Sequence, residues 1–148
     1  MNPYNQKNYL AGPDKLQLLT AKFRSGLKEF GDATRIVEID GERKQLLCAS
    51  ITEVLNYAME YTKLWMPIPD EQKEDFKRDW FIDCRGLYIS NSPLDIIDSA
   101  ELGSIRDWAP VKFDNSVVFA SWYLFIGKVF HGYADFYGVE FMGDTHFN

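Results

Sequence analysis

The chain has 148 residues, of which 46% are hydrophobic, 16% aromatic and 26% charged, and its formal net charge at pH 7 is −6. A chain of this length and apolar content can bury its own core, so the composition excludes disordered, collagen-like and coiled-coil proteins and predicts one globular domain. The longest apolar run, residues 117–126, is about half of the roughly 20 residues that cross a bilayer, which argues against a membrane-spanning segment.

The N-terminal residues 1–13 are polar and include two prolines, which predicts an N-terminal arm before a single α+β domain over residues 14–148. They lack the basic and then apolar segments that mark a signal peptide. Asp14 is typical of a helix N-cap, and apolar residues then recur every three or four positions as far as a stop at Gly31. This predicted helical stripe consists of Leu16, Leu19, Phe23, Leu27 and Phe30.

The next segment combines a strand signal with a tight turn. Residues 34–40 favour a strand, and Asp40-Gly41 suits a two-residue type I′ turn, so a hairpin is predicted over residues 34–48. Ser50 and Glu53 have the spacing of a capping box at the start of a second helix. The inward stripe predicted for that helix is Ile51, Val54, Leu55, Ala58, Thr62 and Trp65.

Two prolines interrupt the helical pattern in the middle of the chain. Pro67 and Pro69 end the second helix, and a short charged helix is predicted over residues 70–79, with Phe76 and Trp80 on its inner side. A strand over residues 86–90 follows, and Ser92-Pro93 is typical of the start of another helix.

Residues 115–126 are rich in β-branched and aromatic side chains, which favours a strand. With a turn at Gly127-Lys128, they predict a second hairpin over residues 117–137, in which Phe125 faces Phe130 and Trp122 faces Tyr133. Since both faces of the first strand are apolar, it should be central in its sheet. One buried helix over residues 115–131 is the alternative, because a continuous apolar run does not fix its own period.

Taken together, these elements predict an α+β fold. Its sheet is expected to be small and mostly antiparallel, with hairpins near residues 34–48 and 117–137, and to pack against three to four helices. No internal repeat was found in the sequence.

Charge and aromatic residues are both concentrated in the second half of the chain. Residues 1–74 have a net charge of −1 and residues 75–148 a net charge of −5, which disfavours a nucleic-acid partner and favours a basic protein. Residues 108–147 hold 12 of the 23 aromatic side chains, and exposed tyrosines make good interface anchors. The predicted binding residues are therefore Tyr133, Asp135, Tyr137, Glu140 and Phe147.

Catalytic motifs are scarce. The sequence contains no Gly-x-Gly-x-x-Gly, Walker A loop, Gly-x-Ser-x-Gly or His-Glu-x-x-His pattern. The two histidines, His131 and His146, lie near Asp135 and Asp144, and such a group could bind a metal or transfer protons, but its spacing matches no specific metal site. We therefore expect no cofactor and no metal, with a small hydrolase or metal-dependent enzyme around His131 and Asp135 as the alternative.

Other reactive side chains have ordinary explanations. Asp95 and Asp98 are expected on a solvated helix face, and Arg85 beside Cys84 is too common an arrangement to indicate a nucleophile. Cys48 and Cys84 form no Cys-x-x-Cys pair, so we expect two buried free thiols and a reducing, cytoplasmic setting.

The middle of the chain also shows a family likeness. The segments Met66-Pro-Ile-Pro-Asp-Glu-Gln-Lys-Glu-Asp-Phe76, Gly86-Leu-Tyr-Ile-Ser90 and Leu94-Asp-Ile-Ile-Asp98 give a proline-led helix, a strand and a helix in that order. This order resembles bacterial immunity proteins of the SMI1/KNR4 type over roughly 35 residues, without the glycine pair expected after the first helix. By analogy, the resemblance implies a small acidic inhibitor of a toxin or host factor.

The sequence thus predicts a non-catalytic protein-binding module with a basic partner, such as an inhibitor, an immunity-type protein or an assembly protein of viral or bacterial origin. Two alternatives remain open at this point: the enzyme described above, and a structural subunit of an oligomer or viral particle.

Overall fold

The structure is a computed structural model that describes residues 3–29, 34–39, 42–90, 106–119, 125 and 127–142. The described helices are α1 (Pro3–Glu29), α2 (Ile51–Trp65) and α3 (Asp70–Asp75). The described strands are β1 (Thr34–Ile39), β2 (Glu42–Ser50), β3 (Ile82–Asp83), β4 (Leu87–Ser90), β5 (Asp107–Trp108), β6 (Val111–Lys112), β7 (Val117–Phe119), β8 (Val129–Phe130), β9 (Ala134–Asp135) and β10 (Glu140–Met142). Within these residues, we find no helix with the length and apolar content needed to span a membrane.

The strands form three sheets in which parallel pairing dominates. The largest has the order β1-β2-β4-β7-β10, and the two smaller sheets have the orders β3-β6-β9 and β5-β8. Only β1 and β2, among the described strands, pair antiparallel; every other described pair is parallel. The fold is therefore mixed α/β, and the prediction of an α+β fold with a mostly antiparallel sheet is wrong.

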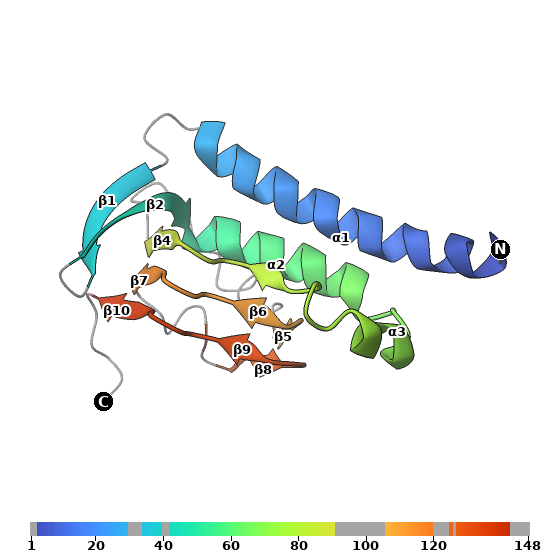
Figure 1. Cartoon of the computed structure of the whole chain (residues 1–148). Coiled ribbons are helices and arrows are strands. Elements are labelled where there is room, and N and C mark those ends of the chain that lie inside the picture. The colour runs from blue at the N-terminus through green and yellow to red at the C-terminus, as the bar shows by residue number, and fades with distance from the viewer. Residues whose placement is uncertain are drawn as a thin grey trace.

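Parallel pairing arises because the second half of the chain winds through three stacked coils, visible in Figure 1 as successive rows of strands. We call residues 80–90 the first coil, residues 106–119 the second coil and residues 127–142 the terminal coil. The same register holds from coil to coil, since Val111 pairs with both Ile82 and Ala134, and Val117 pairs with both Tyr88 and Glu140. This structural repeat was not found in the sequence.

Each coil bends at the same point. Gly86, Asn115 and Gly138 occupy equivalent positions and have φ angles of 65°, 61° and 68°. Glycine and asparagine tolerate this left-handed conformation better than other residues, which explains why these residue types stand at the bends. Ser116 fastens the first two coils together, because its hydroxyl donates to the carbonyl of Cys84 at 2.6 Å and accepts from the N–H of Leu87 at 3.1 Å.

The second predicted hairpin does not exist. Strand β7 pairs in parallel with β4 and β10, whereas β8 pairs with β5 and β9 with β6. The alternative of one helix over residues 115–131 is also wrong, because β7 and β8 fall within that range. Phe125 does contact Phe130, with ring centroids 6.5 Å apart, but not as a hairpin neighbour. The predicted pair of Trp122 with Tyr133 involves a residue outside the described part of the chain.

Several local predictions are confirmed. Strands β1 and β2 pair with Ile39 opposite Glu42, the register that a two-residue turn produces. Strand β7 is internal to its sheet, and Val117 and Val118 are fully buried. The short strand β4 also lies where it was expected.

Helix α2 follows its prediction closely. The Glu53 N–H donates to the Ser50 hydroxyl at 3.1 Å, and the Ser50 N–H donates to the Glu53 carboxylate at 3.0 Å, so the capping box is complete. Every member of the predicted inward stripe is buried, together with Tyr57 and Tyr61. The N–H of Ala109 donates to the Thr62 hydroxyl at 2.9 Å, which ties the second coil to this helix.

Helices α1 and α3 differ from their predictions at their ends. Helix α1 begins at Pro3 rather than at Asp14, because a cap preference of about 1 kcal/mol does not by itself fix where a helix starts. Four members of its apolar stripe are confirmed, with Leu16 and Leu27 buried and Leu19 and Phe23 packed against the core, and the fifth, Phe30, lies outside the described residues. Helix α3 ends at Asp75 instead of Asp79. The helix predicted from Ser92 lies outside the described residues.

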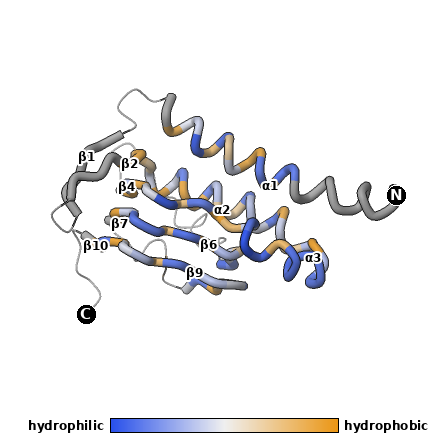
Figure 2. Tube along the Cα trace, viewed as in Figure 1, coloured by the Kyte–Doolittle hydropathy of each residue, from blue (hydrophilic) through white to orange (hydrophobic). Residues whose placement is uncertain are grey.

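The core lies between α2 and the coils, and α1 packs along α2 (Figure 1). Figure 2 shows apolar positions along α2 and a largely hydrophilic α3 at one end of the molecule. The fold therefore places a charged helix beside the ends of the coils, and a cleft lies between them.

Candidate functional site

A cleft of about 580 Å³ opens where α2 and α3 meet the second and terminal coils. The prolines that break the chain after α2 turn α3 back over this region, so residues far apart in sequence meet there. The lining residues are Trp65, Met66, Asp70, Lys73, Glu74, Lys77, Trp80, Pro110, His131, Gly132 and Tyr133.

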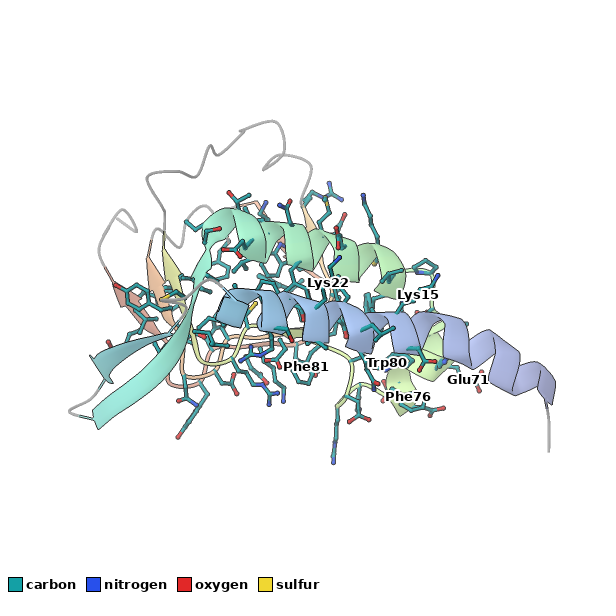
Figure 3. The ribbon with its side chains drawn as sticks, turned by 90° about the horizontal axis from the view of Figure 1, so that it is seen from above. Lys15, Lys22, Glu71, Phe76, Trp80 and Phe81 are labelled. Carbon is teal, nitrogen blue, oxygen red and sulfur yellow. The ribbon has the colours of Figure 1, made fainter. Side chains whose placement is uncertain are left out.

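Three aromatic side chains line the cleft. Trp65 comes from the end of α2, Trp80 from the start of the first coil and Tyr133 from the terminal coil. Trp80 is buried and stacks on Phe76 with ring centroids 4.7 Å apart, and Figure 3 shows the two rings beside α3. The Tyr133 hydroxyl donates to the carbonyl of Lys77 at 2.8 Å, which fixes the terminal coil to the segment after α3.

Both lysines of the cleft interact with groups of the same chain. The Lys73 ammonium lies 4.0 Å from the centroid of the Trp65 ring and donates to the carbonyl of Met66 at 3.0 Å. The Lys77 ammonium donates to the Glu74 carboxylate at 2.8 Å. The Asp70 side chain, in contrast, is fully exposed, while that of Lys73 is only 17% exposed. Both acidic side chains of the rim therefore lie beside a lysine of the same cleft: Oδ1 of Asp70 is 3.8 Å from the Lys73 ammonium, and Glu74 is paired with Lys77. Of the two, Asp70 is the more loosely paired.

His131 stands at the cleft beside a carboxylate, but not the one that the sequence suggested. Its Nε2 lies 2.9 Å from Oδ1 of Asp107, whereas Asp135 lies on β9 in register with Lys112. The hydrogen bond from His131 lowers the pKa of Asp107, with the charge of Arg106 acting in the same direction. The side chains described in this structure include no group of three His, Cys, Asp or Glu residues that could hold a metal ion.

Charged residues of alternating sign occupy one register position across the β3-β6-β9 sheet. The register places Asp83, Lys112 and Asp135 at equivalent positions on three neighbouring strands. The Lys112 ammonium lies 4.8 Å from the centroid of the Phe81 ring and 5.9 Å from that of Tyr133. Lys112 therefore lies near two aromatic rings, at the strand position that pairs in register with Asp135.

Four of the five predicted binding residues lie on the terminal coil. Tyr133 lines the cleft, Asp135 lies at the charged register position, Tyr137 is 80% exposed at the bend and Glu140 begins β10. Phe147 is outside the described residues. Of the five predicted residues, only Tyr133 lines the cleft, and no sequence pattern indicated that Trp65 and α3 form its other wall.

The charged network around Asp83 was missed by sequence reasoning. Arg85 donates to the Asp83 carboxylate from Nε at 2.9 Å and from Nη2 at 3.1 Å, and Arg24 of α1 lies 3.6 Å away. Burial by itself would raise the pKa of Asp83, but the hydrogen bonds from Arg85 and the charge of Arg24 outweigh burial and lower it. No local sequence signal connects Arg24 with this site, because helix α1 is distant in the chain.

Cys84, next to Asp83, is not an activated nucleophile. Its thiol is fully buried, and burial raises its pKa, with the charge of Asp83 adding to the effect. A thiolate is the nucleophilic form, so a raised pKa makes the side chain less reactive. Neither Cys84 nor the half-buried Cys48 forms a disulfide, as expected.

Comparisons of the chain with protein families, curated proteins and solved structures found no match. The likeness to immunity proteins of the SMI1/KNR4 type therefore stays a sequence expectation, and the site has to be interpreted from its own geometry.

Proposed function

We propose that this protein is a non-catalytic binding module that recognises a basic protein through the cleft and the adjoining terminal coil. The observation that carries the proposal is the composition of the cleft: three aromatic side chains and two exposed acidic side chains at the rim, Asp70 and Glu74, which lie 3.8 and 2.8 Å from the cleft lysines. A site of this kind suits a lysine or arginine side chain of a partner.

The energetics favour a cation over an anion as the incoming group. Aromatic ring faces attract cations, and the position of Lys73 over Trp65 is an example within the protein itself. The net charge of −6 adds a long-range attraction for a basic surface, which accelerates encounter more than it tightens the final complex. Inhibition, immunity and assembly are all roles that such a module can serve.

The cleft supports the enzyme alternative less well. Asp107 can orient His131, but the cleft residues that the structure describes include no serine, threonine or cysteine that the imidazole could activate. Binding requires only the cleft surface that is described, whereas nucleophilic catalysis also requires an aliphatic hydroxyl or thiol group for the imidazole to activate.

The proposal can be tested with a matched pair of charge reversals. Glu74 of α3 and Glu60 of α2 are both exposed glutamates within helices, but only Glu74 lines the aromatic cleft. The partner is isolated from the native host with the full chain, and its affinity for the wild type, Glu74→Lys and Glu60→Lys is measured by calorimetry at several salt concentrations. Glu74→Lys should weaken binding about tenfold and reduce its salt dependence, because reversing a rim charge removes one attraction and adds one repulsion.

The control variant, Glu60→Lys, defines the result that would contradict the proposal. Glu60→Lys changes the net charge of the chain by the same amount, so it should reproduce only the small, long-range part of the effect. Equal losses for the two variants, or an affinity that does not change with ionic strength, would show that the cleft is not the electrostatic contact.

A further inference from the structure

Among the strands that the structure describes, those of the terminal coil lie at the edges of their sheets. Strands β8, β9 and β10 each pair with only one described strand, and Figure 1 shows them at the edge of the molecule opposite α1. The other end of the largest sheet continues into the antiparallel pair of β2 and β1. Sheet edges of this kind are the surfaces to which an additional strand can pair.

The backbone of β9 has groups that point away from the stack. The carbonyls of Tyr133, Asp135 and Tyr137 accept hydrogen bonds from the second coil, at 3.0, 2.8 and 2.8 Å. Since alternate residues of a strand direct their backbone groups to opposite sides, the N–H and carbonyl of Ala134 point outward. They lie at the position where a fourth strand would pair.

The side chains specify what that fourth strand should carry. At the charged register position of this sheet, the charge alternates from the buried Asp83 to the half-buried Lys112 and Asp135, so the next position favours a cation. The residues on either side of this position are apolar or aromatic. Ala134 packs against the core, and Tyr137, at the bend, is largely exposed. An extended segment with alternating basic and apolar residues would match both features.

We propose that an extended, basic segment of the partner protein binds by adding a strand to β9, with a lysine or arginine paired to Asp135. This inference rests on the proposed function and specifies how the partner is held. Strand addition supplies affinity through backbone hydrogen bonds and specificity through alternate side chains. A second copy of the same edge fits less well, because it would bring another acidic coil, with its own Asp135 and Glu140, to the acidic position.

The test uses the full chain labelled with ¹⁵N and a short capped peptide that alternates valine and lysine. In the free protein, the Ala134 amide should exchange readily with solvent, and saturating peptide should shift its resonance and slow its exchange. A peptide in which glutamate replaces every lysine should bind about fivefold more weakly, as expected when a favourable cross-strand charge pair becomes a repulsion.

A charge swap identifies the recognition position. Asp135→Lys should reverse the preference, so that the glutamate peptide binds about fivefold more tightly than the lysine peptide. Asp14→Lys makes the same substitution at an exposed position of α1, far from the terminal coil in Figure 1, and should keep the wild-type preference. An unchanged preference in Asp135→Lys would overturn the pairing with Asp135.

Three further outcomes would overturn strand addition. In the first, the Ala134 amide is already protected from exchange in the free monomer. In the second, a dimer that forms with rising protein concentration protects this amide. In the third, the lysine peptide leaves the resonances of β9 unchanged. If that peptide or the isolated partner instead perturbs residues around Trp65 and Trp80, the proposed function stands with a different binding mode. If the partner perturbs neither the cleft nor the terminal coil, the proposed function fails as well.

Discussion

Asp83 shows how single residues secure the stack. Its carboxylate receives two hydrogen bonds from Arg85, and Arg24 donates to the backbone carbonyls of Asp83 at 3.2 Å and of Arg85 at 3.0 Å. A buried carboxylate costs free energy unless charged donors compensate for its lost hydration, and Asp83 is buried. In this protein the donors come from the adjoining turn and from α1, so the charge also connects the helix to the first coil.

The first prediction concerns the pH dependence of stability. The folded-state pKa of Asp83 lies below its usual 3.8, so this carboxylate stabilises the fold above that value, and the stabilisation is lost as the pH falls through the folded-state pKa. Asp83→Asn should lower the free energy of unfolding by about 1–3 kcal/mol at neutral pH. In urea titrations, the difference from the wild type should shrink below pH 3.8. A difference that is constant with pH would contradict the role of the charge; the exposed Asp79→Asn is the control.

The second prediction separates backbone strain from side-chain crowding at the bends. Gly86 and Gly138 have nearly the same positive φ, but a Cβ at Gly138 would lie 2.5 Å from Oδ1 of Asn115, whereas a Cβ at Gly86 meets nothing within 4 Å. Gly86→Ala should cost about 1–2 kcal/mol from conformation alone. Gly138→Ala should cost more, because the Asn115 side chain must also move. Thermal unfolding of the two variants makes the comparison, and equal costs would rule out the contact.

At the scale of elements, Tyr57 connects both long helices to the coils. Its ring stacks on Phe23 of α1, with centroids 4.1 Å apart, and its hydroxyl lies 2.7 Å from that of Thr20. The same hydroxyl accepts the backbone N–H of Asp83 at 2.8 Å. One buried side chain on α2 therefore positions α1 on one side and the first coil on the other.

The third prediction follows from this connection. Tyr57→Phe keeps the ring contacts but leaves the buried N–H of Asp83 without its acceptor, so it should cost about 1–3 kcal/mol in urea unfolding. Thr20→Val removes only the bond between the two hydroxyls and should cost less, about 0.5–1.5 kcal/mol. If Thr20→Val proves as costly as Tyr57→Phe, the bond to Asp83 is not what secures the first coil.

The elements differ in how far the sequence could predict them. The capping box of Ser50 and Glu53 and the stripe of α2 depend on residues within a few positions of one another, so their pattern is visible in the chain. The pairing of Val111 with Ile82 and Ala134 depends on positions that are far apart and unequally spaced. Short two-residue strands with dissimilar side chains leave no periodic signal, which explains why parallel coils were mistaken for a hairpin.

The same reasoning applies to the candidate site. Tyr133, Asp135 and Tyr137 were predicted because aromatic and acidic residues cluster in one short segment of the sequence. The cleft itself could not be predicted, because its second wall depends on how the prolines after α2 direct α3 across the coils. The position of Lys73 over Trp65 follows from that tertiary arrangement.

At the scale of the whole molecule, the two ends of the stack are unlike. One end is extended by the β1 and β2 pair and packed under α1, and the other presents the edge strands β8, β9 and β10 beside an aromatic cleft. The chain also carries a net charge of −6. Shape and charge together support the proposal that a basic partner binds at the end with the terminal coil.

The fourth prediction, and the most direct test of this account, is the hydrogen-exchange footprint of the isolated partner on the full chain. We expect slower amide exchange at residues 131–137 of the terminal coil and at residues 73–80 along the cleft, with α1 unchanged. Slower exchange confined to α1 and the outer side of α2, with the terminal coil and the cleft unaffected, would contradict the assignment of the binding face.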